Sequence, residues 1–174
     1  DYKFLVEPGR PTTLKQRFRS QGKSLLKVST LSQQAISKKA QASIFQEFQK
    51  FAHDCDLLVF SDFNYGFLPQ ALINKITKIA SLNNVMIVAD SQSSSQTGDI
   101  SRFKGAKLIT PTEHEARIAL KNYDDGLVVL ADKLIAKNGA ENILLKLGAD
   151  GLIAQHTSST KDSPHTDQFP ALNV

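Results

Sequence analysis

The side chains with the clearest chemical potential are two aspartates that stand just past predicted strands. Asp62 comes shortly after Asp56–Phe60, and Asp90 directly follows Val85–Ala89. Short apolar segments bounded by polar residues are typical of strands buried on both faces. A carboxylate at the end of such a strand could hold Mg²⁺, accept substrate hydroxyls or cap the next turn. Capping is the commoner role of one such aspartate, but two on successive strands favour a binding site.

A second group of candidates flanks later turns. Pro111 suits the first turn of a helix, and Glu115 then lies one turn into that helix, where the helix dipole alone favours an acidic residue. Gly148 and Gly151 lie in a tight connection between two apolar segments. Glycines there let backbone N–H groups approach a phosphate, although a hairpin turn needs them equally. Structural and functional interpretations therefore both stay open for these residues.

Basic side chains gather near the start of the chain, where residues 1–50 hold ten Lys or Arg against three Asp or Glu. These charges alternate with apolar residues and form no block. A phosphorylated small molecule or a solvated face therefore explains them better than nucleic acid. In an extended segment Lys15 and Arg17 share one face, where they could hold a phosphate or blunt an exposed strand edge.

The elements that position these residues alternate in type. Two extended segments around Gln21-Gly22 predict a hairpin, and the helices and strands beyond it predict a parallel sheet with right-handed crossovers. In such folds ligands bind at the edge where the carboxyl ends of the strands meet. The predicted strands are Pro11–Phe18, Ser24–Val28, Asp56–Phe60, Val85–Ala89, Ala106–Ile109, Ile143–Leu147, Leu152–Gln155 and one starting at Phe169, after a loop over His156–Asp167. The predicted helices are Ser32–Ala52, one starting at Pro69, Pro111–Leu120 and Leu127–Lys137.

The composition fits one main domain with a hydrophobic core. The chain has 174 residues, 41% of them hydrophobic, and a formal net charge of +4. No run approaches the roughly 18 apolar residues of a membrane span, so we expect no membrane partner. The single cysteine, Cys55, rules out an internal disulfide and fits the reducing cytoplasm.

Six segments in order carry a resemblance to a known family: RPTTLKQRF, SDFNYGFL, VADSQ, RFKGAKLITPTEHE, LLKLGADG and FPALNV. Together they resemble the ribokinase-like (PfkB) carbohydrate kinases. Within that family they look most like the D-glycero-β-D-manno-heptose-7-phosphate kinases, the kinase half of ADP-heptose synthases. The resemblance implies a three-layer α/β/α core with a mostly parallel sheet over residues 31–174. Residues 1–30 would form a β lid, or a hairpin close to it.

The resemblance also implies roles for individual residues. The γ-phosphoryl group of ATP would pass, with Mg²⁺, to a sugar or a sugar phosphate such as heptose 7-phosphate. Asp62 would lie near the substrate and the phosphates, and with it we assign Lys15, Arg17 and Asp90, identified above from the residues, to substrate binding. Thr112, Lys146, Gly148 and Gly151 would bind the nucleotide. Glu115 matches the Glu of the family's Asn-x-x-Glu motif, which organises Mg²⁺ and phosphate.

The catalytic base of the family belongs to a Gly-Ala-Gly-Asp motif, which we expect beyond Val174. Because the chain also begins without Met, we expect a middle section of a longer kinase that is inactive alone. We also expect the hairpin to pair with a second copy of itself, since a two-stranded piece has little core of its own.

Three positions depart from the heptose-kinase pattern. Tyr65 and Gln92 stand where lysines are expected, and Thr112 stands where asparagine is expected. Phosphoryl transfer depends on positioning and on electrostatic stabilisation of charge. The departures therefore favour an alternative, a catalytically degraded kinase-like binding or scaffold module. A third hypothesis is a phosphoacceptor receiver domain that uses Asp62, but this would not explain the hairpin.

Overall fold

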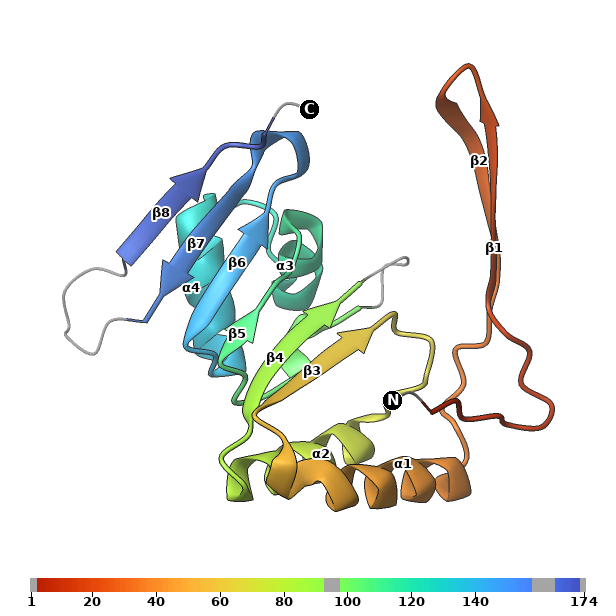
Figure 1. Ribbon diagram of the computed structural model, residues 1–174. Coiled ribbons are helices and arrows are strands. Elements are labelled where there is room, and N and C mark those ends of the chain that lie inside the picture. Colours follow the sequence, from red (N-terminus) through yellow and green to blue (C-terminus); the bar gives the residue numbers. More distant parts are fainter. Residues whose placement is uncertain (1–2, 93–97, 158–164, 173–174) are drawn as a thin grey trace.

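A projecting hairpin and an α/β body make up the computed structural model, which describes residues 3–92, 98–157 and 165–172 (Figure 1). The hairpin strands are β1 (Leu14–Ser20) and β2 (Lys23–Thr30). The sheet of the body contains, in spatial order, β3 (Leu57–Asp62), β4 (Met86–Ser91), β5 (Leu108–Ile109), β6 (Asn142–Lys146), β7 (Leu152–His156) and β8 (His165–Phe169). The helices are α1 (Lys38–Phe51), α2 (Gln70–Leu82), α3 (Glu113–Leu120) and α4 (Leu127–Asn138).

The sheet of the body is mostly parallel, as the sequence predicts. β3, β4, β5 and β6 run parallel, and β7 and β8 are added antiparallel to them. Each parallel crossover contains helical structure, which is how parallel neighbours must be joined. The carboxyl ends of the four parallel strands therefore meet along one edge. The predicted candidates Asp62, Asp90 and Lys146 lie there, whereas Lys15 and Arg17 lie on the hairpin.

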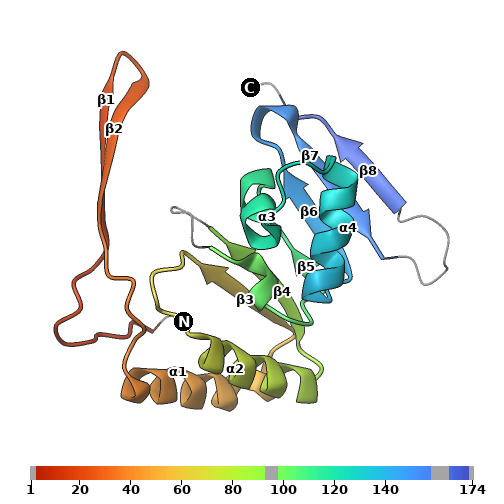
Figure 2. The ribbon, with the colours of Figure 1, turned by 180° about the vertical axis from the view of Figure 1, so that it is seen from behind.

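The described helices pack on one face of the sheet, as the two opposite views show (Figures 1 and 2). Side chains of the strands alternate accordingly. Ile143 and Leu145 of β6 are completely buried against the helices, together with Leu130 of α4. On the other face of the sheet Val59 of β3 and Met86 of β4 remain about half exposed. The hydrophobic core is thus the layer between the sheet and the helices.

The predicted hairpin is confirmed, with its turn at Gln21 and Gly22. Both residues have positive φ, 47° and 78°. A turn of this kind matches the right-handed twist of the flanking strands, and it needs glycine or a residue that tolerates the left-handed region. Every residue of β1 and β2 is exposed.

The first helix begins six residues later than predicted. Ser37 caps it, because its Oγ accepts a hydrogen bond from the Ala40 N–H at 3.2 Å. Residues 31–36 remain outside the helix, and the Ile36 N–H donates instead to the Gly66 carbonyl at 3.0 Å. A tertiary hydrogen bond and the burial of Ile36 thus override the local helical periodicity.

The end of the sheet also differs from the prediction. His165–Phe169 forms strand β8, where the sequence suggests a loop up to Asp167 and a strand from Phe169 onward. β8 pairs with β7 over its whole length, and four of its five residues are exposed. A polar strand at the edge of a sheet lacks the apolar pattern by which strands are recognised. Among the described residues, no helix is long and apolar enough to cross a membrane.

Candidate functional site

Three side chains from three neighbouring strands meet at the carboxyl edge of the sheet. Asp90, near the end of β4, accepts hydrogen bonds from the Thr110 hydroxyl and from the Lys146 ammonium, both at 2.8 Å. Thr110 directly follows β5, and Lys146 is the last residue of β6. Their side chains are only partly buried, 28% exposed for Asp90 and 40% for Lys146. The cluster therefore presents a paired carboxylate and ammonium to solvent.

The two predicted aspartates lie at the same edge but on opposite faces of the sheet. In the parallel register Asp62 is level with Ser91, and Asp90 is level with Ser61. Because successive side chains of a strand point to opposite faces, Asp62 projects into the helix-covered side and Asp90 to the other side. Asp62 is 4% exposed. The two carboxylates therefore do not form one pair of ligands.

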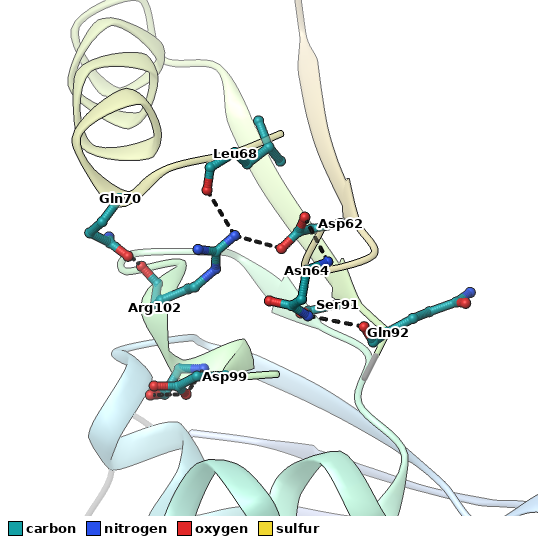
Figure 3. Close-up of polar contacts among 9 residues, drawn as sticks. Asp62, Asn64, Leu68, Gln70, Ser91, Gln92, Asp99 and Arg102 are labelled. Carbon is teal, nitrogen blue, oxygen red and sulfur yellow. Dashed lines mark hydrogen bonds and ion pairs between the residues drawn. The ribbon is translucent and has the colours of Figure 1, made fainter. Parts of the chain in front are cut away.

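Asp62 is held in a network of internal contacts (Figure 3). One carboxylate oxygen accepts the N–H of Asn64 at 3.1 Å, and the other accepts the guanidinium of Arg102 at 2.5 Å. Arg102 also donates to the Leu68 carbonyl at 2.9 Å. The Asn64 side chain reaches across to Ser91 on β4 at 2.9 Å. The capping role that the sequence left open for Asp62 is present, joined by a buried ion pair.

A cavity of about 360 Å³ lies between the N-terminal segment and the carboxyl end of β3. Its lining combines aromatic rings with hydroxyl and carboxylate groups, including those of Thr12, Thr13, Asp62, Phe63, Tyr65 and Phe67. Rings beside hydrogen-bonding groups suit an amphipathic ligand such as a sugar, since ligand sites combine apolar surface with a few polar groups. This cavity is the second candidate site at the carboxyl edge.

Two charged residues fasten the N-terminal wall of the cavity. The guanidinium of Arg10 donates to three backbone carbonyls, those of Gln34 at 2.8 Å, Ser32 at 3.3 Å and Tyr65. Glu7 accepts the N–H of Ser37 at 2.6 Å. Hydrogen bonds from the Ser37 side chain and backbone, and the nearby Arg10 charge, hold the pKa of Glu7 below its ordinary value. The segment is thereby tied to the start of α1.

The hairpin reaches the same region through Lys15. Its ammonium lies over the ring of Phe63, 4.7 Å from the centroid, and over the ring of Tyr65 at 5.2 Å. Arg17 is two residues further along β1, on the same face and exposed. Of the two predicted substrate-binding residues on the hairpin, Lys15 is thus the one that contacts the body.

Thr112 and Glu115 lie in a capping box at the start of α3. The Thr112 hydroxyl accepts the Glu115 N–H at 3.2 Å, and the Glu115 carboxylate accepts the Thr112 N–H at 2.7 Å. Such a reciprocal pair satisfies two of the backbone donors left free at a helix start. Pro111 therefore precedes the cap residue and is not the first helical residue as the sequence suggested. Glu115 is 7% exposed.

Glu115 is the predicted metal ligand, so the number of other metal-binding side chains near it decides how Mg²⁺ could be held. In the part of the chain that the structure describes, no group of three or more His, Cys, Asp or Glu could hold a metal ion. The described residues therefore do not form a metal site made of protein ligands alone. Mg²⁺ in phosphoryl-transfer sites is held by one or two carboxylates together with the substrate's phosphates. A single carboxylate such as that of Glu115 fits that manner of binding.

The two predicted glycines have different surroundings. At Gly148, with φ +65°, a Cβ would meet no atom within 4 Å. At Gly151, with φ +90°, a Cβ would lie 1.9 Å from the Phe169 carbonyl oxygen. Gly151 is thus required by the close approach of the chain after β8. Gly148 faces open space two residues after Lys146, where a ligand could approach the backbone.

Three residues of these sites escaped the sequence analysis. Arg102 lies in the RFKG segment, and a charged residue between the buried Ile100 and Phe103 was a usable signal. Thr110 stands just past a predicted strand, as Asp62 and Asp90 do. Arg10 gives no local signal, because the carbonyls that its guanidinium binds are 22 to 55 residues away.

Comparison with known proteins agrees with this arrangement. A protein-family model described as "pfkB family carbohydrate kinase" matches residues 3–174. The bifunctional protein HldE of Desulfatibacillum aliphaticivorans is 33% identical over 153 residues, which is 86% of this chain and 30% of that protein. The chain therefore belongs to the pfkB family of carbohydrate kinases.

Two solved structures show the same fold. Ribokinase from Giardia lamblia superposes with a TM-score of 0.69 at 15% identity, over 94% of this chain and 50% of that one. The Arabidopsis thaliana ribokinase complexed with ribose and ATP gives a TM-score of 0.55 at 12% identity, over 85% of this chain and 46% of that one. The chain thus spans about a third of the HldE relative and about half of each ribokinase.

Proposed function

We propose that the protein carrying this chain transfers the γ-phosphoryl group of ATP to a hydroxyl of a sugar or sugar phosphate, with heptose 7-phosphate as the particular candidate. The observation that carries the proposal is the Asp90–Thr110–Lys146 cluster. It lies at the carboxyl edge of a parallel sheet, beside an open glycine turn, in a chain of the carbohydrate kinase family. That edge is where α/β folds bind ligands.

The nucleotide would lie along β5, β6 and the turn after β6. Lys146 is positioned to meet the phosphates, since its ammonium is 40% exposed. Gly148 leaves room for phosphate oxygens against the backbone. Thr112 and Glu115 would stand at the adjacent start of α3, where the helix dipole favours anions. Asp90 orients Lys146 by a charge-assisted hydrogen bond.

The acceptor sugar would occupy the cavity at the end of β3. Its aromatic rings offer apolar surface, and Thr12 and Thr13 offer hydrogen-bonding groups. Asp62 also lines the cavity, with its carboxylate engaged by Arg102 and the Asn64 N–H. Lys15 and Arg17 would contribute positive charge from the hairpin above it. Holding acceptor and donor in fixed positions is the largest part of what a protein supplies in this reaction.

ATP supplies the transferred phosphoryl group, and Mg²⁺ accompanies its phosphates. The resemblance assigns the catalytic base to a Gly-Ala-Gly-Asp motif, and residues 1–174 contain no such motif. We therefore expect the 174 residues alone to bind nucleotide weakly and to transfer nothing. ATP dependence and a single cysteine also favour the cytoplasm as its location.

The test is ATP binding to the 174-residue chain, measured by titration calorimetry. Lys146→Met should weaken binding about tenfold to a hundredfold, because a hydrogen bond to a charged group contributes about 1.5–3 kcal/mol. Lys107→Met is the matched control: Lys107 pairs with Glu141, but it precedes β5 and so lies at the opposite edge of the sheet. Equal affinity of Lys146→Met and wild type would contradict the proposal.

The transfer reaction is tested in parallel with a longer protein that contains this chain. We expect it to phosphorylate at least one member of a panel of heptose and hexose phosphates, and we expect no turnover by the 174 residues alone. Turnover by the short chain at a hundredth of the longer protein's rate would refute the assignment of the base to a motif that residues 1–174 lack.

A binding or scaffold module is the second candidate. Two observations favour it: Asp62 is closed off by Arg102, and Glu115 is engaged in a helix cap. A longer protein that binds ATP but transfers no phosphoryl group to any sugar of the panel would support this module over the kinase.

A further inference from the structure

Lys15 has an unusual pair of neighbours for a lysine on an exposed hairpin. Phe63 and Tyr65 follow β3 and stack on one another, with ring centroids 6.1 Å apart and an angle of 20° between the planes. The Lys15 ammonium lies within about 5 Å of both centroids. A cation at this distance from a ring face is attracted by the ring quadrupole. The two rings therefore form a seat for the lysine.

The seat turns the basic face of the hairpin toward the body. Lys15 and Arg17 share one face of β1, and Lys27 of β2 pairs with Arg17 on that face. The opposite face carries apolar side chains, among them Phe18 and its cross-strand partner Leu26. Since Lys15 contacts the rings beyond β3, the positive face and not the apolar face is the one directed at the cavity.

Among the described residues near the cavity, Lys15 is also the cation that can still receive an anion. Arg10 lines the cavity, but its guanidinium is engaged by three backbone carbonyls. Arg102 is engaged by Asp62 and the Leu68 carbonyl. Among the described residues, no carboxylate pairs with Lys15. A ring face orients an ammonium group without neutralising its charge, unlike a carboxylate.

We propose that Phe63 and Tyr65 are positioning residues, which hold Lys15 at the rim of the cavity so that its ammonium binds the phosphate group of a phosphorylated acceptor sugar. This proposal rests on the proposed function and deepens it, because it assigns the acceptor to the sugar phosphates and not to the neutral sugars. Both rings line the cavity.

The contact itself is tested by NMR of the 174-residue chain. Ring currents should shift the Lys15 Cε protons upfield of those of Lys23, a hairpin lysine at the tip next to the turn. The shift should largely disappear in Phe63→Leu and in Tyr65→Leu, and it should persist in Tyr65→Phe, which keeps the ring. Random-coil shifts for Lys15 in the wild type would overturn the seat.

The role in recognition is tested by binding of sedoheptulose 7-phosphate and of sedoheptulose, as probes with and without phosphate. Tyr65→Leu and Lys15→Met should each weaken binding of the phosphate by about fivefold to tenfold. The neutral sugar should change less than twofold. Tyr65→Phe should match the wild type, and Lys23→Met serves as the charge-matched control. The double variant should lose no more than Lys15→Met alone, because the two residues act as one unit.

The outcomes separate the inference from the function. Equal losses for both probes, additive effects in the double variant, or wild-type affinity in Tyr65→Leu would overturn the seat as a phosphate-positioning device while ATP binding still supports the kinase. Failure of the wild type to bind either the sugar phosphate or ATP would overturn both proposals. Thermal unfolding of each variant verifies that it is folded, and we expect this because all replaced positions are at least partly exposed.

Discussion

At the scale of single residues, the sheet edge uses charged pairs in two different settings. Asp62 and Arg102 are withdrawn from water, with side-chain exposures of 2% and 21%. Asp90 and Lys146 remain partly in contact with solvent. Removing one member of a buried pair lowers stability strongly, because no water can solvate the charge that remains. A solvated pair can separate to admit a ligand. An aspartate paired with a cation therefore stabilises the fold in one place, and in the other it leaves the pair accessible to a ligand, as the proposed function requires.

The buried pair leads to a prediction for stability. Arg102→Met should lower the free energy of unfolding by about 3 kcal/mol, because it leaves the Asp62 carboxylate buried with the Asn64 N–H as its one donor among the described residues. Combining it with Asp62→Asn should recover part of the loss by removing the stranded charge. Urea denaturation followed by circular dichroism measures both effects.

The control for this prediction is Lys133→Met, which breaks the more exposed pair with Asp125. A pair of this kind contributes about 0–1 kcal/mol. If Arg102→Met were as mild as this control, Asp62 would have to be accessible to water and free to bind a ligand directly.

It was easier to predict which residues lie at the site than to predict the face of the sheet on which each side chain lies. Strand ends marked Asp62 and Asp90, and the glycine turn marked Lys146, from the sequence alone. The sequence could not tell that the two aspartates lie on opposite faces, because a shift of one residue in the strand register reverses every side chain. Likewise, nothing local connects Lys15 with Phe63 and Tyr65, which are about fifty residues away in the chain. Long-range contacts of exposed side chains leave no periodic trace.

At the scale of elements, the turn between β6 and β7 separates a structural glycine from a candidate binding glycine. Both have positive φ, so any other residue is strained at either position. Only Gly151 is also blocked by backbone, with the Phe169 carbonyl oxygen at 1.9 Å from the position of a Cβ. Substitutions at Gly148 and Gly151 can therefore be compared within one turn.

Gly148→Ala should cost about 1–2 kcal/mol of stability, the strain of a left-handed residue, and leave the chain folded. It should also weaken ATP binding, because the added methyl group occupies the open space next to the backbone. Gly151→Ala should be far more destabilising, since backbone of the segment after β8 would have to move. Thermal melts and ATP titration distinguish these effects. Unchanged ATP affinity in Gly148→Ala would remove this turn from the nucleotide site.

Elements with strong local signals were predicted well, and those decided by tertiary contacts were not. The hairpin, the parallel order of β3 to β6 and helix α4 follow from turn residues and apolar periodicity. The late start of α1 depends on the hydrogen bond between Ile36 and Gly66, and β8 depends on pairing with β7. In both cases a partner distant in sequence selects a conformation that the local residues do not favour.

At the scale of the whole molecule, the hairpin projects from the body as a separate arm (Figures 1 and 2). Its basic face is directed at the cavity, and its other face carries Leu14, Phe18, Leu26 and Val28, which are 39–55% exposed. A two-stranded hairpin is marginally stable by itself in water. The same face of a second copy can bury an apolar face of this kind in a symmetric interface. We therefore propose a homodimer through this face.

The dimer is tested by light scattering after gel filtration at high micromolar concentration. The wild type should have twice the mass of a single chain, and Phe18→Asp should be a monomer, because a charge in the centre of the apolar face cannot be buried without a partner. Leu82→Asp is the matched control, since Leu82 is an exposed leucine at the end of α2, away from the hairpin. The monomer should also bind the sugar phosphate more weakly, because a hairpin without its partner holds Lys15 less firmly over Phe63 and Tyr65. A wild-type monomer whose hairpin is ordered by NMR would show that the apolar face needs no second copy.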